Sequence, residues 1–468
     1  MEILKKTEKI MTPERVLFIV AVLGSALYIS LIFNDNLWVD EAFTASLIRQ
    51  SFPEMIRDTV SDTLPPFYNV FGFLAVSLFG FSSVVLKFCS CLAMILLLFF
   101  GGRKLHTLKG FRAAFLYELF LVAMPHFLHY GVEIRMYSWG VFSCGMAALY
   151  FLEIPENRSA FRGFTLFSVF SGYIHHFALV SCGMLWLILL FSYVLKKNKE
   201  DIILFFKYLG LFLILYLPGL ILTFYQIKNA SSYFSMAPLS LKSFISDIRF
   251  PFVTNITPLS ALLLLMAVFA AALPFIRKSV KDSSQGLLLM SAIYLTLCFA
   301  YAVSVISGRS LFTARYLVPC LSIFWLGTAL LSDEALSFFG DKSPVAPVLI
   351  ALIAVTLVTG YLMTFREEYS PGAEQMKAFF NENIKSGDAI IINEDVPEIE
   401  ICFRYYFPDL LKTGWKNADN INGTIWYLVR EGSGDVLENA DTPGYNLEYI
   451  CDFFFDRYSF SLYRADKR

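Results

Sequence analysis

Residues 16–46 read VLFIVAVLGSALYISLIFNDNLWVDEAFTAS, in which an apolar run is followed by two adjacent acids, Asp40 and Glu41. An apolar run of roughly 17–25 residues is long enough to cross a bilayer as a helix. Similar runs recur as far as residue 364. The 468 residues are 57% hydrophobic and 16% charged, whereas soluble domains are about 25% charged. The sequence therefore predicts a polytopic α-helical membrane protein. A net charge of -1 gives no reason to expect nucleic acid binding.

About eleven membrane spans are expected, and the first is expected to remain uncleaved. Their ranges are 16–34, 82–100, 113–130, 136–152, 164–180, 181–195, 202–225, 259–276, 286–305, 317–332 and 345–364. With the N-terminus in the cytoplasm, every basic cluster falls on the cytoplasmic side, as the positive-inside rule requires. These clusters lie at 5–9, 101–112, 157–162, 196–199 and 277–281. Segment 67–80 is too short to span, so we predict a partly embedded helix that starts after Pro65 and Pro66.

The polar tail, residues 366–468, differs in composition from the rest of the chain. With this topology, we expect it to lie outside the cytoplasm. The stretch MKAFFNENIKSGDAIIINED (376–395) predicts an amphipathic helix, a turn and a strand. TIWYLVREGSG (424–434) and YSFSLYRADK (458–467) predict two more strands. We therefore divide the chain into a transmembrane domain (1–365), whose outer loop is 35–81, and a small extracytoplasmic α/β domain (366–468). Whether Cys402 and Cys451 form a disulfide is left open by the sequence.

Acids and cations from separate segments gather on the predicted outer side of this topology. They are Asp40, Glu41, Asp62, Lys87, Glu133, Arg135, Tyr137, His175, Arg309 and Arg315. Taken singly, these residues have structural explanations. Asp40 and Glu41 could anchor the first span at the membrane–water interface, and Arg309 and Arg315 could reach lipid headgroups. Glu133 and Arg135 could form a pair that holds a hairpin. Charges at membrane depth are costly and mark sites, so their co-location favours a function. His175 and His176 lack a third ligand at metal spacing, so no metal site is predicted.

This set of side chains suits one kind of chemistry at a membrane surface. A carboxylate can accept the proton of an attacking hydroxyl. Neighbouring cations stabilise a phosphate whose negative charge grows as it leaves. A departing phosphate needs no general acid, unlike the leaving group of ordinary glycoside hydrolysis. One base with several cations therefore fits displacement of a sugar from a lipid phosphate.

Several of these segments resemble the GT-C superfamily of polyprenyl-phosphate-sugar-dependent glycosyltransferases, within it the protein O-mannosyltransferase and lipid A aminoarabinose transferase group. The resemblance rests on WVDEA (38–42), DTLPPFYNVFGFLAVSLFG (62–80), SSVVLKFCSCLAMILLLFFGGRKL (82–105), YGVEIRMYS (130–138) and SLFTARYLVP (310–319). It implies that Asp40 is the base, that Glu41 is its neighbour and that Asp62 lines the acceptor side. It also implies that Lys87, Arg135 and Arg315 contact the lipid phosphate. Leu64 stands where many relatives carry a histidine before the two prolines, which is a departure from the pattern.

The expected function is an inverting glycosyltransferase of the plasma membrane that moves a sugar from a polyprenyl-phosphate donor to an extracytoplasmic lipid, glycan or protein. The resemblance implies that no divalent metal is required, although an acid-lined site could hold one. A transporter or flippase of lipid-linked sugars is the alternative without chemistry, and it predicts charges along a pathway and related halves. A polymerase or ligase of lipid-linked sugars is the alternative that the sequence separates least.

Overall fold

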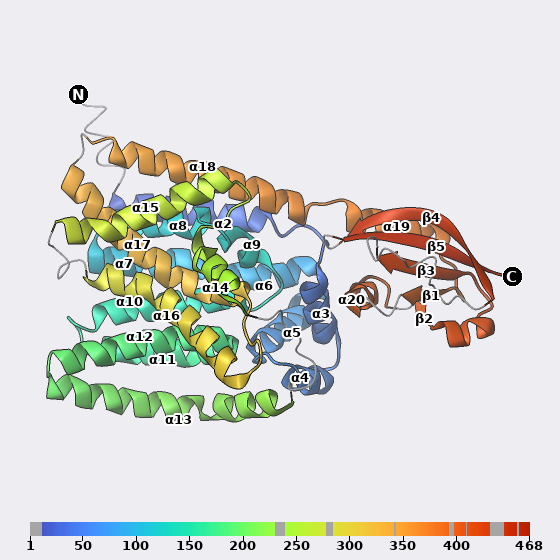
Figure 1. Cartoon of the computed structure of the whole chain (residues 1–468), viewed down its shortest axis with the longest axis horizontal. Helices are drawn as coiled ribbons and strands as arrows, with labels where there is room; N and C mark the ends of the chain where they lie inside the picture. The colour runs from blue at the N-terminus through green and yellow to red at the C-terminus, as the bar shows by residue number, and fades with distance from the viewer. Residues whose placement is uncertain are drawn as a thin grey trace.

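The chain forms a bundle of long helices with a small α/β part at one end (Figure 1). This computed structural model describes residues 12–229, 239–277, 284–340, 343–392, 397–408, 410–430, 444–455 and 458–468. The basic cluster at 5–9 and most of the cluster at 277–281 lie outside the described residues.

Eleven helical segments run along the bundle, and each coincides with one predicted span. They are α2 (Pro13–Ser30), α6 (Ser83–Leu96) with η1 (Leu97–Gly101) and α7 (Gly102–Lys109), α8 (Phe111–Ala123), α10 (Tyr137–Glu153), α11 (Ala160–Ile174), α12 (His176–Leu195), α13 (Lys199–Asn229), α15 (Thr257–Ile276), α16 (Ser284–Ser307), α17 (Val318–Phe339) and α18 (Val345–Glu368). In the described part of the chain, eight helical segments are long and apolar enough to cross a bilayer. The chain is thus an integral membrane protein. Because α8, α10 and α11 are shorter, the number of spans remains a prediction.

One predicted boundary is wrong, because the helices expected at 164–180 and 181–195 meet at His175 rather than near residue 180. His175 has an extended backbone, with φ of -157°. Its side chain caps α12, since Nδ1 accepts a hydrogen bond from the backbone N–H of Phe177 at 3.0 Å. The break falls at a histidine, and the nearby Gly172 lies within α11, so apolar periodicity alone could not locate it.

Three helices connect α2 to α6 and lie near the α/β part (Figure 1): α3 (Val39–Arg49), α4 (Phe52–Ser61) and α5 (Phe67–Phe79). The short helix predicted at 67–80 is confirmed as α5. It starts directly after Pro66, and Gly80 ends it with φ of 86°, a conformation that glycine adopts without strain. Leu74, Leu78 and Phe79 are exposed on its surface. Exposed apolar side chains of this kind suit contact with lipid, and the embedding of α5 remains a prediction.

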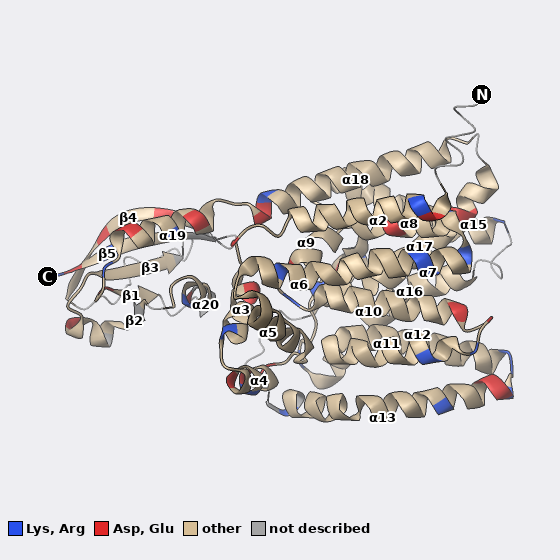
Figure 2. Ribbon diagram, turned by 180° about the vertical axis from the view of Figure 1, so that it is seen from behind, with Lys and Arg blue, Asp and Glu red and all other residues tan. Residues whose placement is uncertain are grey.

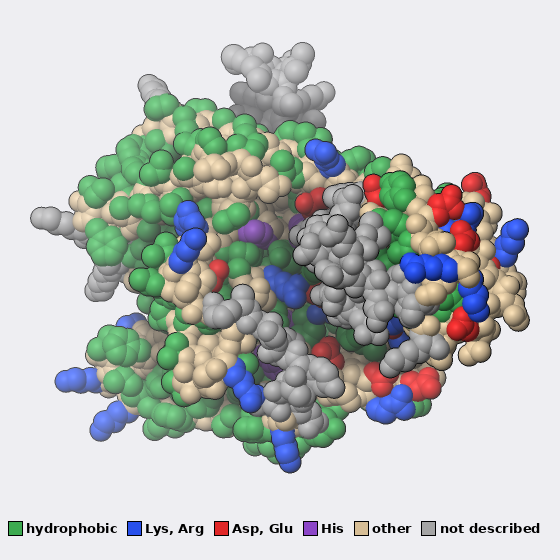
Figure 3. Space-filling model, turned by 45° about the vertical axis from the view of Figure 1, so that its right-hand side comes forward, with side chains coloured by type: hydrophobic (Ala, Val, Ile, Leu, Met, Phe, Trp, Pro, Cys, Tyr) green, Lys and Arg blue, Asp and Glu red, His purple; other side chains and the backbone are tan. Residues whose placement is uncertain are grey.

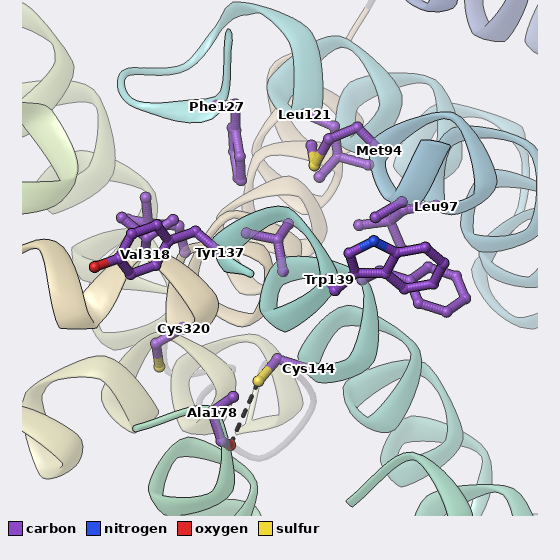
Figure 4. Packing of buried hydrophobic residues seen from close by; sticks show 14 of the residues in the cluster. Met94, Leu97, Leu121, Phe127, Tyr137, Trp139, Cys144, Ala178, Val318 and Cys320 are labelled. Atoms are coloured by element: carbon purple, nitrogen blue, oxygen red, sulfur yellow. Dashed lines mark hydrogen bonds between the residues drawn. The ribbon is translucent and has the colours of Figure 1, made fainter. Parts of the chain in front are cut away.

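The centre of the bundle is formed by α10 and α17. In the most apolar 18-residue stretch of α17, 83% of the residues are buried. In the corresponding stretches of α13 and α18 only 17% are buried, so these helices face outward. Gly140 of α10 lets the two central helices approach closely, because a Cβ atom there would lie 2.9 Å from Pro319. Figure 4 shows side chains of α6, α8, α10 and α17 packed in this core. The central helices thus form a fixed frame for the residues at their ends.

The remaining elements are short helices and one sheet. The helices are α9 (Phe127–Val132), α14 (Leu241–Ile248), η3 (Phe250–Phe252), η4 (Ala314–Leu317), α19 (Gly372–Asn383), α20 (Pro397–Tyr406) and η5 (Trp415–Asn420). The strands are β1 (Ala389–Ile392), β2 (Leu411–Lys412), β3 (Ile425–Arg430), β4 (Tyr445–Phe455) and β5 (Tyr458–Lys467). The sheet order is β2-β1-β3-β5-β4, with β2, β1 and β3 parallel and β3, β5 and β4 antiparallel.

The predicted helix and three strands of the tail are confirmed as α19, β1, β3 and β5. Helix α20 and strands β2 and β4 were not predicted. A register shift between Tyr449 and Cys451 interrupts the alternation of β4, which weakens its signal in the sequence. Cys451 carries a free thiol, so it forms no disulfide with Cys402.

The two ends of the bundle carry different loops. Helix α7 and the turns that join α10 to α11 and α12 to α13 lie at the end opposite to the sheet (Figure 2). These segments hold the basic clusters at 101–112, 157–162 and 196–199. Helices α3, α4 and α5 lie at the other end, next to the sheet (Figures 1 and 2). The structure thus separates the basic clusters from the acids of the outer loop.

Candidate functional site

Glu41 fastens the first turn of α3 to a neighbouring segment. Its Oε2 accepts a hydrogen bond from the backbone N–H of Trp38 at 3.2 Å, and its Oε1 accepts one from Ile134 at 2.8 Å. The side chain is buried, and burial raises the pKa of Glu41 to about 8. Both carboxylate oxygens of Glu41 are thus occupied by backbone N–H groups.

Asp40, the preceding residue, points toward two cations. Its Oδ2 lies 2.8 Å from Nη1 of Arg315 and 3.9 Å from Nη2 of Arg135. Arg315 comes from η4, directly before α17, and Arg135 follows α9. Adjacent helical residues point in directions about 100° apart, which explains why Asp40 and Glu41 have different partners.

Trp38 and Glu133 form the next contact of the cluster. Trp38 Nε1 donates a hydrogen bond to Glu133 Oε1 at 3.0 Å. The guanidinium of Arg315 lies 5.4 Å from the centre of the Trp38 ring, within the range of a cation–π contact. Glu133 is buried, and this burial raises its pKa to about 7. Arg135 is held separately, because its Nη1 donates to Thr44 Oγ1 at 2.9 Å.

Aromatic rings close the other side of the cluster. The ring of Tyr137 lies 5.5 Å from that of His175, which lies 5.2 Å from that of Tyr316. In Figure 4 Tyr137 lies beside Val318 at the edge of the drawn core, and its hydroxyl points away from the drawn residues. Since His175 Nδ1 accepts a hydrogen bond from backbone, a neutral ring carries its proton on Nε2.

Buried polar atoms without hydrogen-bond partners mark this cluster. Among the described residues, six such buried atoms belong to it: Asp40 Oδ2, Glu133 Oε2, Arg135 Nε, Tyr137 Oη, His175 Nε2 and Arg315 Nε. The contact between Asp40 and Arg315 is thus a close ion pair without hydrogen-bond geometry at Oδ2. A buried polar atom without a partner costs about 1–3 kcal/mol. The cluster is therefore suited to a ligand with several donors and acceptors.

Asp62 lies beside the cluster on the loop between α4 and α5. It lines a small cavity of about 10 Å³ together with Arg135, Leu64 and Asn69. The backbone of this loop is held from elsewhere, because His176 Nε2 bonds Thr63 O at 3.1 Å. Leu64, the residue at the position of the departure, thus faces the same cavity as Asp62.

The prediction that Lys87 contacts a donor phosphate is not supported by its position. Lys87 is fully buried and forms an ion pair with Glu368, at the end of α18. Its Nζ also donates to Asn34 Oδ1 at 2.7 Å and to Asn36 O at 3.3 Å. These three acceptors match the three protons of an ammonium group. The sequence predicts how deep Lys87 lies in the membrane. It does not predict the pairing with Glu368, which lies 281 residues later in the chain.

Arg309 is likewise not brought into the cluster. It lies exposed in the turn after α16, and the described residues give it no ion pair. As for metals, no three His, Cys, Asp or Glu side chains within the described ranges are arranged to hold an ion. That no metal is required remains a prediction.

Trp38, Thr44 and Tyr316 also belong to the cluster but were not predicted as site residues. Tyr316 directly follows Arg315, and Trp38 lies two positions before Asp40. Closeness in the sequence to a predicted charged residue was therefore a usable signal for both. Thr44 lies one helical turn after Asp40, on the same face of α3.

A larger cavity of about 250 Å³ adjoins the cluster. Its wall comes from α8, α9 and the turn between them, residues 253–256 and α18, and includes His126, His129 and Glu367. The ring of Tyr130 lies 4.9 Å from His129 and 5.2 Å from Tyr137, so it separates cavity and cluster. Figure 3 shows a hollow between the bundle and the α/β part, with basic, acidic and histidine side chains inside.

The fold and this site define a polytopic membrane protein with a charged cluster at one end of its helical bundle. Two crystal structures of ArnT from Cupriavidus metallidurans have a similar fold. The structure in the apo state has a TM-score of 0.62 and 11% identity, over 96% of this chain and 97% of that chain. The structure bound to undecaprenyl phosphate has a TM-score of 0.61 and 12% identity, over the same shares. The fold that the sequence resemblance implied is confirmed. No protein-family model matches the chain, and no curated protein matches its sequence.

Proposed function

We propose that this protein is an inverting membrane glycosyltransferase that moves a sugar from a polyprenyl-phosphate donor to an extracytoplasmic acceptor. The observation that carries the proposal is Asp40 beside Arg315 and Arg135, surrounded by buried polar atoms that lack protein partners. The undecaprenyl phosphate bound to an ArnT structure of the same fold supports a lipid phosphate as the donor's carrier.

In the proposed reaction, the hydroxyl oxygen of the acceptor attacks the anomeric carbon of the sugar from the face opposite to the phosphate. Asp40 takes the hydroxyl proton as the new glycosidic bond forms. The bond from the anomeric carbon to the phosphate oxygen breaks, and its electron pair remains on that oxygen. Arg315 and Arg135 stabilise the resulting charge, so a divalent metal is not required. The phosphate draws Arg315 toward itself and leaves Asp40 to the acceptor.

The other residues of the cluster are assigned to substrate contact. Tyr137 Oη and His175 Nε2 can donate hydrogen bonds to oxygens of the sugar or phosphate, and Glu133 Oε2 can accept one from a hydroxyl. Asp62 is assigned to the acceptor side, as the sequence resemblance implies, and it lines a small cavity beside Arg135.

We infer a location in the plasma membrane, with the N-terminus in the cytoplasm and the site and α/β domain (366–468) outside. The basic clusters at the opposite end of the bundle support this orientation.

The test uses the full-length protein in detergent, undecaprenyl-phosphate sugars as donors and cell-envelope extract as the source of acceptor. Release of undecaprenyl phosphate in a single turnover is the readout. Asp40→Asn keeps the shape of the side chain but loses basicity, so release should fall at least about 100-fold. Glu156→Gln, an exposed acid at the other end of the bundle, is the matched control and should have the native rate. A native rate for Asp40→Asn would refute the assignment. Donor movement across vesicles without any release would instead favour a transporter.

A further inference from the structure

The α/β part of the chain forms hydrogen bonds and an ion pair with the segment that leads into α3. Asp35 lies in this segment, between α2 and α3. Its Oδ2 accepts a hydrogen bond from Lys377 Nζ of α19 at 2.8 Å. Its Oδ1 accepts one from the hydroxyl of Tyr405 of α20, also at 2.8 Å. Two helices of the tail therefore bind one carboxylate of the outer loop.

A second tyrosine fixes the backbone of the same segment. The hydroxyl of Tyr406 donates to the carbonyl oxygen of Asp35 at 2.9 Å and accepts from the N–H of Leu37 at 2.8 Å. One phenol group thus bridges two peptide groups directly before α3 begins. This contact sets the direction in which the chain enters the helix.

The far end of α3 is held by the same helix of the tail. Arg49, the last residue of α3, donates from Nη1 to the carbonyl oxygen of Tyr405 at 3.1 Å. Its guanidinium also lies 4.4 Å from the centre of the Phe81 ring. Helix α20 therefore contacts both the segment that enters α3 and the last residue of α3, and Figure 1 shows the two helices side by side.

We propose that the α/β part positions α3, and that Asp35 is the positioning residue through which it acts. Resting on the proposed function, this means that Asp35, held by Lys377, Tyr405 and Tyr406, keeps Asp40 directed toward Arg315 and Arg135. Asp40 is the second residue of α3, so a small shift of the entering segment moves its carboxylate. A displacement of about 1 Å at a reacting group can slow a reaction by about 100-fold.

The expected effect is on geometry rather than on global stability. Asp35 and Lys377 are partly exposed, with side-chain exposures of 38% and 27%, and exposed ion pairs contribute little to stability. The cationic groups assigned to the donor phosphate lie on other segments, at η4 and after α9. Removing Asp35 should therefore reduce kcat while the affinity for donor remains.

Two measurements on the full-length protein test the proposal. The first is amide hydrogen exchange of residues 39–49, which needs no turnover, for Asp35→Ala and for Lys377→Ala. Exchange of α3 should be at least several-fold faster in both variants, while exchange in α10 and α17 is unchanged. The second is single-turnover transfer and donor KM. Asp35→Ala should lower kcat by about 10-fold to 100-fold, with KM within twofold of native.

Conservative and control variants sharpen the test. Asp35→Asn retains an acceptor for Tyr405 but loses the charge that binds Lys377, so its rate should be intermediate. Asp58→Ala removes an acid of α4 whose one ion pair among the described residues is with its exposed neighbour Arg57, and it should behave as native.

Unchanged exchange of α3 in both variants would overturn the proposal. Faster exchange everywhere, or an equal loss of kcat and donor affinity, would overturn it as well, because either result indicates general unfolding. If the native protein released no undecaprenyl phosphate from any donor, the proposed function would fail, whereas exchange would still decide whether the α/β part positions α3.

Discussion

Asp40 Oδ2 lies 2.8 Å from Arg315 Nη1, although Asp40 follows the first helix of the bundle and Arg315 precedes α17. Each charge is stabilised by the other at the end of the membrane-spanning bundle, where an isolated charge is costly. Arg315 also lies over the ring of Trp38, and Asp40 also faces Arg135. In the proposed reaction, a phosphate that competes for Arg315 would release the carboxylate of Asp40, so donor binding would make the proposed base available.

The roles of the two adjacent acids should separate on substitution. Glu41→Gln can accept only one of the two backbone hydrogen bonds, so the free energy of unfolding should fall by about 1–3 kcal/mol. Its transfer rate should fall less than that of Asp40→Asn. Thermal unfolding and single-turnover transfer measure these effects. A native rate for Asp40→Asn with an inactive Glu41→Gln would reverse the two roles.

Arg315 should be needed for binding of the donor's carrier lipid. Arg315→Lys keeps a charge but loses the planar fork of the guanidinium, so affinity for undecaprenyl phosphate should fall about 10-fold or more. The matched control is Arg309→Lys, since Arg309 is exposed in the turn after α16. Equal affinity in both variants, measured by binding of labelled undecaprenyl phosphate in detergent, would leave Arg315 as a structural partner of Asp40.

Lys87 should stabilise the fold rather than bind the donor. Lys87→Met leaves Glu368 buried without its cation, which should lower the free energy of unfolding by about 3–5 kcal/mol. The double variant Lys87→Met/Glu368→Gln should recover part of this loss and bind undecaprenyl phosphate within twofold of native. If Lys87→Met were as stable as native but bound the lipid weakly, the original phosphate assignment would hold instead.

Glu133 should make stability depend on pH. Burial raises its pKa from 4.5 to about 7, so the folded state binds this proton more tightly than the unfolded chain. Between these values the folded state holds more protons, and stability contributed by Glu133 falls as pH rises. Glu133→Gln removes this contribution. Melting temperatures at pH 5 and pH 8 should therefore differ less in the variant than in native protein, and equal differences would contradict the assignment.

The orientation of the bundle can be tested by labelling intact cells with a membrane-impermeant thiol reagent. A Cys451→Ser background removes a partly exposed native thiol of the tail. Cysteines introduced at Ser61 and Glu382 should react, and a cysteine at Lys199 should react only after lysis. All three positions are exposed. Labelling at position 199 in intact cells would show that the topology is inverted and that the site faces the cytoplasm.

Local patterns in the sequence determined most of the secondary structure. Each apolar range predicted as a span coincides with one helical segment, because apolar runs in a bilayer must satisfy their backbone groups within a helix. The prolines before α5 and the alternation in β3 and β5 also act through near neighbours in the chain.

Only the tertiary structure decided which charged side chains meet. Arg315 pairs with Asp40, whereas Lys87, at a similar predicted depth, pairs with Glu368. The contact of α20 with α3 was equally invisible, since α20 itself was not predicted. Depth in a membrane follows from composition, but the partner of a charge depends on the rotation and packing of helices hundreds of residues apart.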